Sequence, residues 1–139
     1  MTGNDARATS KSAIEGFLAA FRARDAAGQF ARMHPDVEIQ EPDSLPYGGV
    51  WRGHEGWRAL SLAILATCDL GINPDGHRLI GDAEGEDFVL MTRLVGTWRD
   101  TGRALDVRIL EYWRVVDGLI VTIRPHYFDT AAVVGWEKG

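Results

Sequence analysis

The sequence has 139 residues, a net charge of −5, an apolar fraction of 45% and one cysteine. This size is typical of a single domain, which we expect over residues 1–139 with about residues 1–9 flexible. An acidic chain lacks the basic surface that nucleic acids and anionic membranes require, and the lone Cys68 excludes an intramolecular disulfide and a thiolate metal cluster.

Two helices are predicted near the start of the chain. Over residues 10–24, apolar side chains recur at the spacing of one helical face, with Ser10 as the expected N-cap. That face carries Ile14, Phe17, Leu18 and Phe21. A short second helix is expected over about residues 25–33, capped by Asp25 and ended by Pro35.

A strand, a loop and a third helix follow. Residues 36–41 alternate between apolar and polar side chains, which predicts a strand. Residues 43–53 predict a loop, and helical spacing returns over about residues 54–69. Further strands are predicted over about residues 76–83, 86–99, 104–116 and 119–129. Hairpin turns are expected at residues 100–102 and at the Asp-Gly pair 117–118.

This order of elements indicates the fold class. Segregated helices and strands are typical of α+β domains. We expect a cone-shaped α+β barrel, in which a curved, mostly antiparallel sheet wraps around three N-terminal helices. Such a cone can enclose a pocket the size of a small ligand.

Two glutamates lie on strand faces that are otherwise apolar. In the strand over 104–116, side chains alternate with a period of two, so Glu111 shares its face with apolar neighbours. These neighbours are Leu105, Val107, Ile109, Trp113 and Val115. In the first strand, Glu41 shares a face with Val37 and Ile39. A carboxylate in apolar surroundings must be paired, protonated or facing a cavity, so both are candidate site residues.

Structural roles are also open for both glutamates. Glu41 stands at the end of its strand, where the face can run out into solvent. Glu111 can be a core residue satisfied by an arginine such as Arg93 or by a tryptophan N–H.

Several segments carry a family resemblance along nearly the whole chain. They are Ala13–Phe17 continuing to Arg24-Asp25, His34–Pro42, Gly48–Gly53, Glu111–Val115 and Pro125–Ala132. In these segments the chain resembles the nuclear transport factor 2-like superfamily, in its SnoaL-like and ketosteroid-isomerase-like branch. The resemblance supports the same cone-shaped fold.

The resemblance also implies roles for the two carboxyl groups. Glu41, before Pro42, matches the position of a proton-shuttling carboxylate, and Glu111 matches a carboxylic acid that stays protonated and donates to an oxyanion. Phe17 stands where the isomerases have an oxyanion-binding tyrosine. Because phenylalanine has no donor, and losing such a donor costs about 10²- to 10³-fold in rate, steroid isomerisation is not the expected reaction.

His126 is a third catalytic candidate, on one geometric condition. A bulge at Pro125 would turn His126 into the cone, where an imidazole can act as an acid or base near neutral pH. Without that bulge, Val121, Ile123, Pro125 and Tyr127 form the apolar face and His126 points away. The expected substrate-binding residues are Phe17, Tyr47, Trp51, Trp57, Trp113 and Tyr127.

Three functions follow from these patterns. The first is a cofactor-independent enzyme acting on a small, largely apolar carbonyl, enol or epoxide compound by isomerisation, dehydration, aldol-type cyclisation or epoxide hydrolysis. The second is a non-catalytic module that binds a hydrophobic ligand. The third is a structural dimerisation domain, in which Phe17, Trp57 and Trp113 would fill the cone. No metal-ligand spacing occurs, so no metal or cofactor is expected.

The expected partners are a small hydrophobic molecule and a second copy of the chain. Arginines along the strands are compatible with ion pairs on the sheet surface or with a dimer interface, and the resemblance implies homodimerisation through the sheet face. No apolar run approaches the roughly 20 residues of a membrane span, and the first ten residues lack a secretory signal. We therefore expect no membrane partner and a cytoplasmic location.

Overall fold

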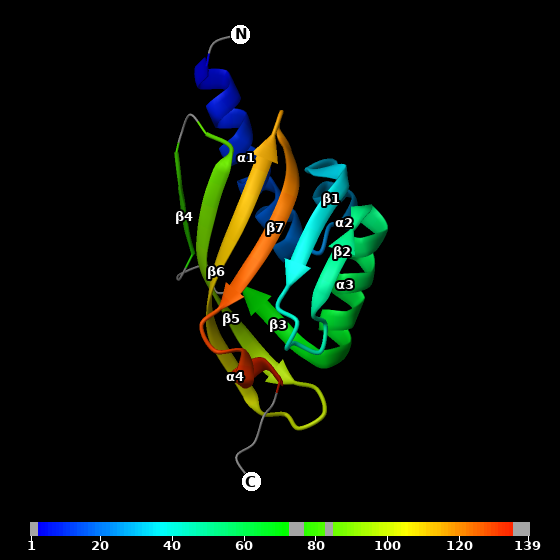
Figure 1. Ribbon diagram of the computed structural model, residues 1–139. Coiled ribbons are helices and arrows are strands. Elements are labelled where there is room, and N and C mark those ends of the chain that lie inside the picture. The colour runs from blue at the N-terminus through cyan, green and yellow to red at the C-terminus, as the bar shows by residue number, and fades with distance from the viewer. Residues whose placement is uncertain (1–2, 73–76, 83–84, 135–139) are drawn as a thin grey trace.

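The computed structural model describes residues 3–72, 77–82 and 85–134, and it confirms the cone-shaped α+β architecture (Figure 1). The elements are α1 (Gly3–Arg22), α2 (Ala26–Ala31), β1 (Met33–Glu41), β2 (Gly49–Arg52), α3 (Gly53–Thr67), β3 (Cys68–Ile72), β4 (Arg78–Gly81), β5 (Asp87–Trp98), β6 (Ala104–Val116), β7 (Leu119–Tyr127) and α4 (Thr130–Val134). Within these described ranges, no helix is both long enough and apolar enough to cross a membrane.

One curved sheet forms the wall of the cone. Its strands lie in the order β2-β1-β7-β6-β5-β3, and β4 pairs with β5 outside this path. Strands β5, β6 and β7 form an antiparallel meander, whereas β7 pairs with β1 in parallel. The parallel pair joins segments from opposite ends of the chain, and Figure 1 shows β1 and β7 side by side. The sheet is therefore mixed but mostly antiparallel.

The inner face of the sheet is read directly from the strand register. Exposed and buried residues alternate along β5 and β6, and residues opposite each other in an antiparallel pair share a face. One inner row therefore contains Leu90 on β5, Glu111 on β6 and Pro125 on β7. The neighbouring inner row contains Thr92, Ile109 and Tyr127 in the same strand order, which gives polar side chains on the buried face.

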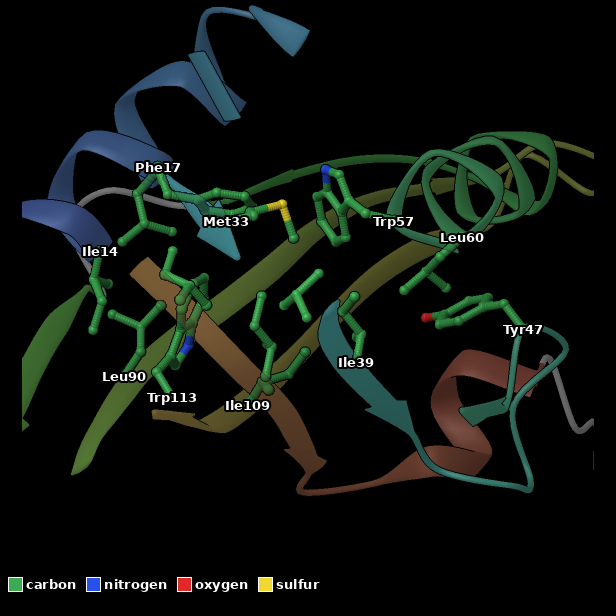
Figure 2. Packing of buried hydrophobic residues seen from close by; sticks show 14 of the residues in the cluster. Ile14, Phe17, Met33, Ile39, Tyr47, Trp57, Leu60, Leu90, Ile109 and Trp113 are labelled. Carbon is green, nitrogen blue, oxygen red and sulfur yellow. The ribbon is translucent and has the colours of Figure 1, made fainter. Parts of the chain in front are cut away.

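An aromatic cluster packs the helices against this inner face. Phe17 of α1 lies 5.3 Å from Trp57 and 5.3 Å from Trp113, measured between ring centroids. Figure 2 shows Phe17, Trp113 and Leu90 at one end of the core, and Tyr47 and Leu60 at the other. The indole N–H of Trp57 donates to Gln29 Oε1 at 2.9 Å, so the polar atom of this buried ring is satisfied.

The predicted turns are confirmed. Asp117 and Gly118 both have positive φ values, 51° and 77°, as a tight turn between strands of right-handed twist requires. Gly102 has a φ of 69° and donates its N–H to the carbonyl oxygen of Trp98 at 2.8 Å. Both positions favour residues that tolerate the left-handed region.

Several predicted boundaries are wrong. Helix α1 begins at Gly3, so Ser10 lies inside it and is not the N-cap. Asp25 does cap α2, since it accepts from the Gly28 N–H at 3.0 Å. That helix ends before Met33, however, and Pro35 lies within β1, where its missing N–H is tolerated near the start of the strand.

Three short elements were not predicted. Strand β2 lies inside the segment expected to be a loop, β3 begins at Cys68 where the third helix was expected to continue, and α4 follows the last strand. Each is too short for its own periodicity to be distinctive. Strand β3 exists because it pairs with the end of β5, from Cys68 opposite Trp98 onward. The first and last residues of the strand predicted over 76–83 lie outside the described residues.

Candidate active site

Glu41 is the last residue of β1 and is 8% exposed. Its position two residues after Ile39 places both side chains on the same face of the strand. Val37 and Ile39 are 0% and 1% exposed, so this is the inner face. The prediction that Glu41 shares the apolar face is therefore confirmed, and the expectation that this face runs out into solvent at Glu41 is wrong.

Glu111 lies in the middle of β6, on the inner face. Its same-face neighbours Ile109 and Trp113 are each 2% exposed, and its cross-strand partners are Leu90 and Pro125. Glu111 as a whole residue is half-buried, and burial of its carboxyl group raises its pKa.

Neither glutamate has a cationic partner among the described residues. Arg93, the arginine considered as a partner for Glu111, instead pairs with Asp106, its Nε donating to Asp106 Oδ1 at 2.6 Å. Arg93 and Asp106 are both exposed, on the outer face of the sheet. The electrostatic environment of the two inner carboxyl groups is therefore set by burial, by neutral dipoles and, at Glu41, by the charge of Glu111.

Two tyrosines connect to Glu41 through hydrogen bonds. The hydroxyl of Tyr127, from β7, donates to Glu41 Oε2 at 3.4 Å, and the hydroxyl groups of Tyr47 and Tyr127 lie 2.9 Å apart. Tyr47 belongs to the loop between β1 and β2, and its carbonyl oxygen accepts the Trp51 indole N–H at 3.1 Å. Figure 2 shows the Tyr47 hydroxyl pointing into the core. Tyr47 and Tyr127 are 80 positions apart, so sequence spacing did not predict the hydrogen bond between their hydroxyl groups.

Burial raises the pKa of both carboxyl groups. It raises the pKa of Glu41 to about 8, with the charge of Glu111 adding to the rise and the Tyr127 hydrogen bond opposing it. It raises the pKa of Glu111 to about 7, with the Trp113 indole N–H opposing it. A raised pKa at Glu111 agrees with the protonated role that the family resemblance implies. Because the charge of Glu111 adds to the rise at Glu41, the two carboxyl groups titrate as a coupled pair.

The order of the two values differs from the roles that the family resemblance implies. The resemblance makes Glu41 the ionised base and Glu111 the protonated donor, but the pKa of Glu41 is the higher of the two. Burial is the main cause of both shifts, and the charge of Glu111 adds to the rise at Glu41. With both pKa values near neutral pH, either carboxyl group can hold the proton.

Several donors surround the carboxyl groups. Burial raises the pKa of the Tyr47 and Tyr127 phenols well above the usual range, so both remain protonated donors. The Trp113 indole N–H favours a charged Glu111, yet it does not meet hydrogen-bond geometry and is buried without a partner in the described structure. The phenol hydrogens are used in the chain of hydrogen bonds from Tyr47 through Tyr127 to Glu41. Among the described residues, the Trp113 N–H is the nearby donor without a partner, and Phe17 provides none.

His126 does not join this site. The register irregularity between β6 and β7 falls where Arg114 pairs with Thr122 and Val115 pairs with Ile120, which leaves Val121 as the extra residue. Pro125 therefore keeps regular pairing with Glu111 on the inner face. His126 is exposed on the outer face, opposite Leu110, and its expected catalytic role is corrected accordingly.

The predicted substrate-binding residues divide into two groups. Phe17 and Trp57 pack against each other within the aromatic cluster, and the Trp57 N–H is bonded to Gln29. Tyr47 and Tyr127 lie at the carboxyl pair, and Trp51 holds the Tyr47 loop. Trp113 belongs to both groups, because its ring packs against Phe17 while its N–H lowers the pKa of Glu111.

The comparisons with known proteins agree with this fold. Residues 14–123 match the SnoaL-like domain, so the chain belongs to the SnoaL-like domain family. Its structure is similar to that of an NTF2-like protein of unknown function from Burkholderia pseudomallei, with 26% identity, a TM-score of 0.81 and coverage of 94% of this chain and 98% of that chain. The architecture is therefore the nuclear transport factor 2-like cone.

Two further solved structures are similar at lower identity. TerC, co-crystallised with polyporic acid, is 24% identical, with a TM-score of 0.80 and coverage of 92% of this chain and 99% of that one. A candidate polyketide cyclase from Xanthomonas campestris pv. campestris is 14% identical, with a TM-score of 0.74 and coverage of 91% and 93%. No curated protein sequence matches the chain.

Proposed function

We propose that this protein is a cofactor-independent enzyme that transfers a proton next to the carbonyl group of a small, largely apolar compound. The observation that carries the proposal is the pair of inner-face carboxyl groups, Glu41 and Glu111, whose pKa values of about 8 and about 7 lie close to neutral pH. A general base works best when its pKa is near the working pH. Strongly shifted carboxyl groups in a concave site are typical of active sites.

The pair can act in both directions. In this mechanism the ionised carboxylate takes a proton from the carbon beside the carbonyl, and the electron pair of that C–H bond moves onto the carbonyl oxygen. The protonated carboxyl and the Trp113 N–H stabilise the enolate by hydrogen bonding, while the Tyr127 hydroxyl donates to Glu41. Returning the proton to another carbon isomerises a double bond. Attack of the enolate on a second carbonyl closes a ring, and loss of a β-hydroxyl gives dehydration.

The similar structures favour carbonyl chemistry. One is a candidate polyketide cyclase and another, TerC, was co-crystallised with polyporic acid. Isomerisation, dehydration and aldol-type cyclisation all begin with the same proton transfer, so one site serves all three. Epoxide hydrolysis would use the pair to activate water instead, and no feature of the described site favours it over enolate chemistry.

The test requires no knowledge of the natural substrate. The protein is incubated in D₂O with 2-tetralone, an apolar ketone, and exchange of the protons beside the carbonyl is followed by ¹H NMR. We expect exchange faster than in buffer. A Glu38→Gln variant should exchange as fast as the wild type, because Glu38 is on the same strand but its side chain points to the other face.

A binding module is the competing function. Phe17 packs against both Trp57 and Trp113. These three rings occupy space in the cone next to α1, which reduces the room for a ligand there. A binding module predicts that 2-tetralone quenches tryptophan fluorescence while the protein leaves the exchange rate at its buffer value. That combination of results would overturn the enzyme proposal.

We also propose that the protein is a homodimer through the outer face of the sheet. Four exposed apolar side chains gather there on β4, β5 and β6: Ile80 (43% exposed), Val89 (36%), Met91 (40%) and Leu110 (49%). They are contiguous, because Ile80 is opposite Val89 and Met91 is opposite Leu110. Contiguous exposed apolar surface of this kind marks interaction sites.

Leu110→Asp is expected to convert the dimer to a monomer. A charge within the apolar patch would be buried without a partner in the dimer, which is strongly unfavourable. Light scattering coupled to gel filtration measures the mass. Leu62→Asp is the matched control, because Leu62 is 63% exposed on α3, away from the sheet. A monomeric wild type at micromolar concentration would contradict the proposal.

A further inference from the structure

Thr92 is a buried polar residue that the proposed mechanism does not use. It lies in the middle of β5 and is 5% exposed. Its hydroxyl makes no hydrogen bond within the described part of the chain. An unsatisfied buried hydroxyl is unfavourable, since it has lost its bonds to water without replacement. Valine has nearly the same shape and would avoid this cost, so the hydroxyl calls for an explanation beyond packing.

The strand register places Thr92 beside the carboxyl pair. On β5 the inner-face positions alternate with exposed ones, and Thr92 follows Leu90, which is opposite Glu111. Thr92 pairs with Ile109 on β6, and Ile109 pairs in turn with Tyr127 on β7. Thr92 is therefore the diagonal neighbour of Glu111, at a Cα separation of about 7–8 Å. Both side chains project from the same concave face.

The other inner-face residues of β5 show that Thr92 is the exception. They are Phe88, Leu90, Leu94, Gly96 and Trp98. None of these side chains has an oxygen, so Thr92 provides the single hydroxyl on the inner side of this strand. Thr92 on β5 lies on one side of Glu111 on β6. On the opposite side, toward β7 and β1, are Tyr127, Tyr47 and Glu41. A ligand at Glu111 would have polar groups on two sides.

We propose that Thr92 forms a second polar subsite and binds a second oxygen of the substrate. The inference rests on the proposed function, because it assumes that the reacting carbonyl lies at Glu111. The substrate class is then narrower than a simple apolar ketone: it is a compound with two oxygen functions, hydroxyl or carbonyl, on one apolar skeleton. A hydroxyl can donate and accept, so Thr92 selects for the presence of this oxygen.

Matched probes test this subsite by binding. The probes are 2-naphthol, 2,6-dihydroxynaphthalene and 2,7-dihydroxynaphthalene, which share one ring system and differ in the second hydroxyl. Affinities are measured by isothermal titration calorimetry. We expect the wild type to bind at least one diol about 3- to 10-fold more tightly than 2-naphthol, the ratio that one net hydrogen bond gives. Thr92→Val should abolish the preference, and Thr92→Ser should retain it.

Two controls separate a binding role from a structural one. Thr97→Val makes the same chemical change at an exposed position of β5 and should keep the diol preference. Thr92→Val without ligand should melt at the same temperature as the wild type or higher, because an unsatisfied hydroxyl is removed. A melting temperature lower by several degrees would show that the hydroxyl has a structural partner such as a buried water, and would overturn the proposal.

The remaining outcomes distinguish this inference from the proposed function. Equal affinity of the wild type for all three naphthols, or a diol preference that survives in Thr92→Val, would overturn the subsite alone. Failure of all three to bind would overturn the subsite together with the pocket that it extends. If only the subsite is overturned, proton exchange on 2-tetralone by the wild type would still uphold the acid/base function, since 2-tetralone has one oxygen only.

Discussion

Glu111→Gln is expected to lower the enzyme-dependent rate of proton exchange on 2-tetralone by about 10²- to 10⁴-fold, the range that a positioned general acid or base contributes. Glutamine preserves the size and much of the hydrogen bonding of the side chain, but it cannot accept or deliver a proton. Glu41→Gln should have an effect of similar size. Because the two groups act as one pair, the double variant should be no slower than the slower single variant.

The single variants need a check on folding and a control for charge. Far-ultraviolet circular dichroism should be unchanged, since glutamine fits both positions. Glu38→Gln removes one carboxylate from the same strand as Glu41 without touching the inner face, and its rate should equal that of the wild type. Full exchange activity in either Glu41→Gln or Glu111→Gln would remove the carboxyl pair from the mechanism.

The second large effect is on stability. Both carboxyl groups have folded-state pKa values raised above 4.5, to about 8 for Glu41 and about 7 for Glu111. Between about pH 4.5 and about pH 8, the folded protein binds more protons than the unfolded chain. The free energy of unfolding must therefore fall as pH rises through this range. The stabilising contribution is fully present below about pH 4.5 and is lost by about pH 8. One pKa unit corresponds to about 1.4 kcal/mol, so the pair accounts for several kcal/mol.

Urea unfolding at pH 5 and pH 8 measures this loss. The wild type should be several kcal/mol less stable at pH 8, whereas the Glu41→Gln/Glu111→Gln double variant should lose much less. At pH 8 the double variant should exceed the wild type in stability, because it buries neutral amides where the wild type must bury charge. A wild-type stability that does not change between these pH values would show that the two carboxyl groups titrate normally.

The long strands explain why much of the site could be predicted from the sequence. Strict alternation along β6 and the end of β1 was enough to place Glu111 and Glu41 on the inner face, because a period of two leaves no other choice in a regular strand. The same reasoning failed for His126, where the result depends on which residue bulges. The bulge lies at Val121, and its position is set by pairing with β6 rather than by any local pattern.

Other parts of the site required the tertiary structure. Tyr47 is in a loop, where no periodicity indicates direction, and its contact with Tyr127 depends on the pairing of β1 with β7. The order of the two glutamate pKa values depends on burial and mutual repulsion, which residue spacing does not reveal. Thr92 is unremarked in the sequence because threonine is common in strands; only the missing hydrogen-bond partner distinguishes it.

The parallel pairing of β1 with β7 has a consequence for how the protein is made. Glu41 leaves the ribosome long before Tyr127 is synthesised, and the strand that brings them together is the last of the sheet. Contacts between distant parts of a chain form slowly, because a long loop must close first. A nascent chain can therefore fold its helices and pair β5 with β6 while its two acidic groups remain apart. Glu41 and Glu111 come together only once β7 has joined β1.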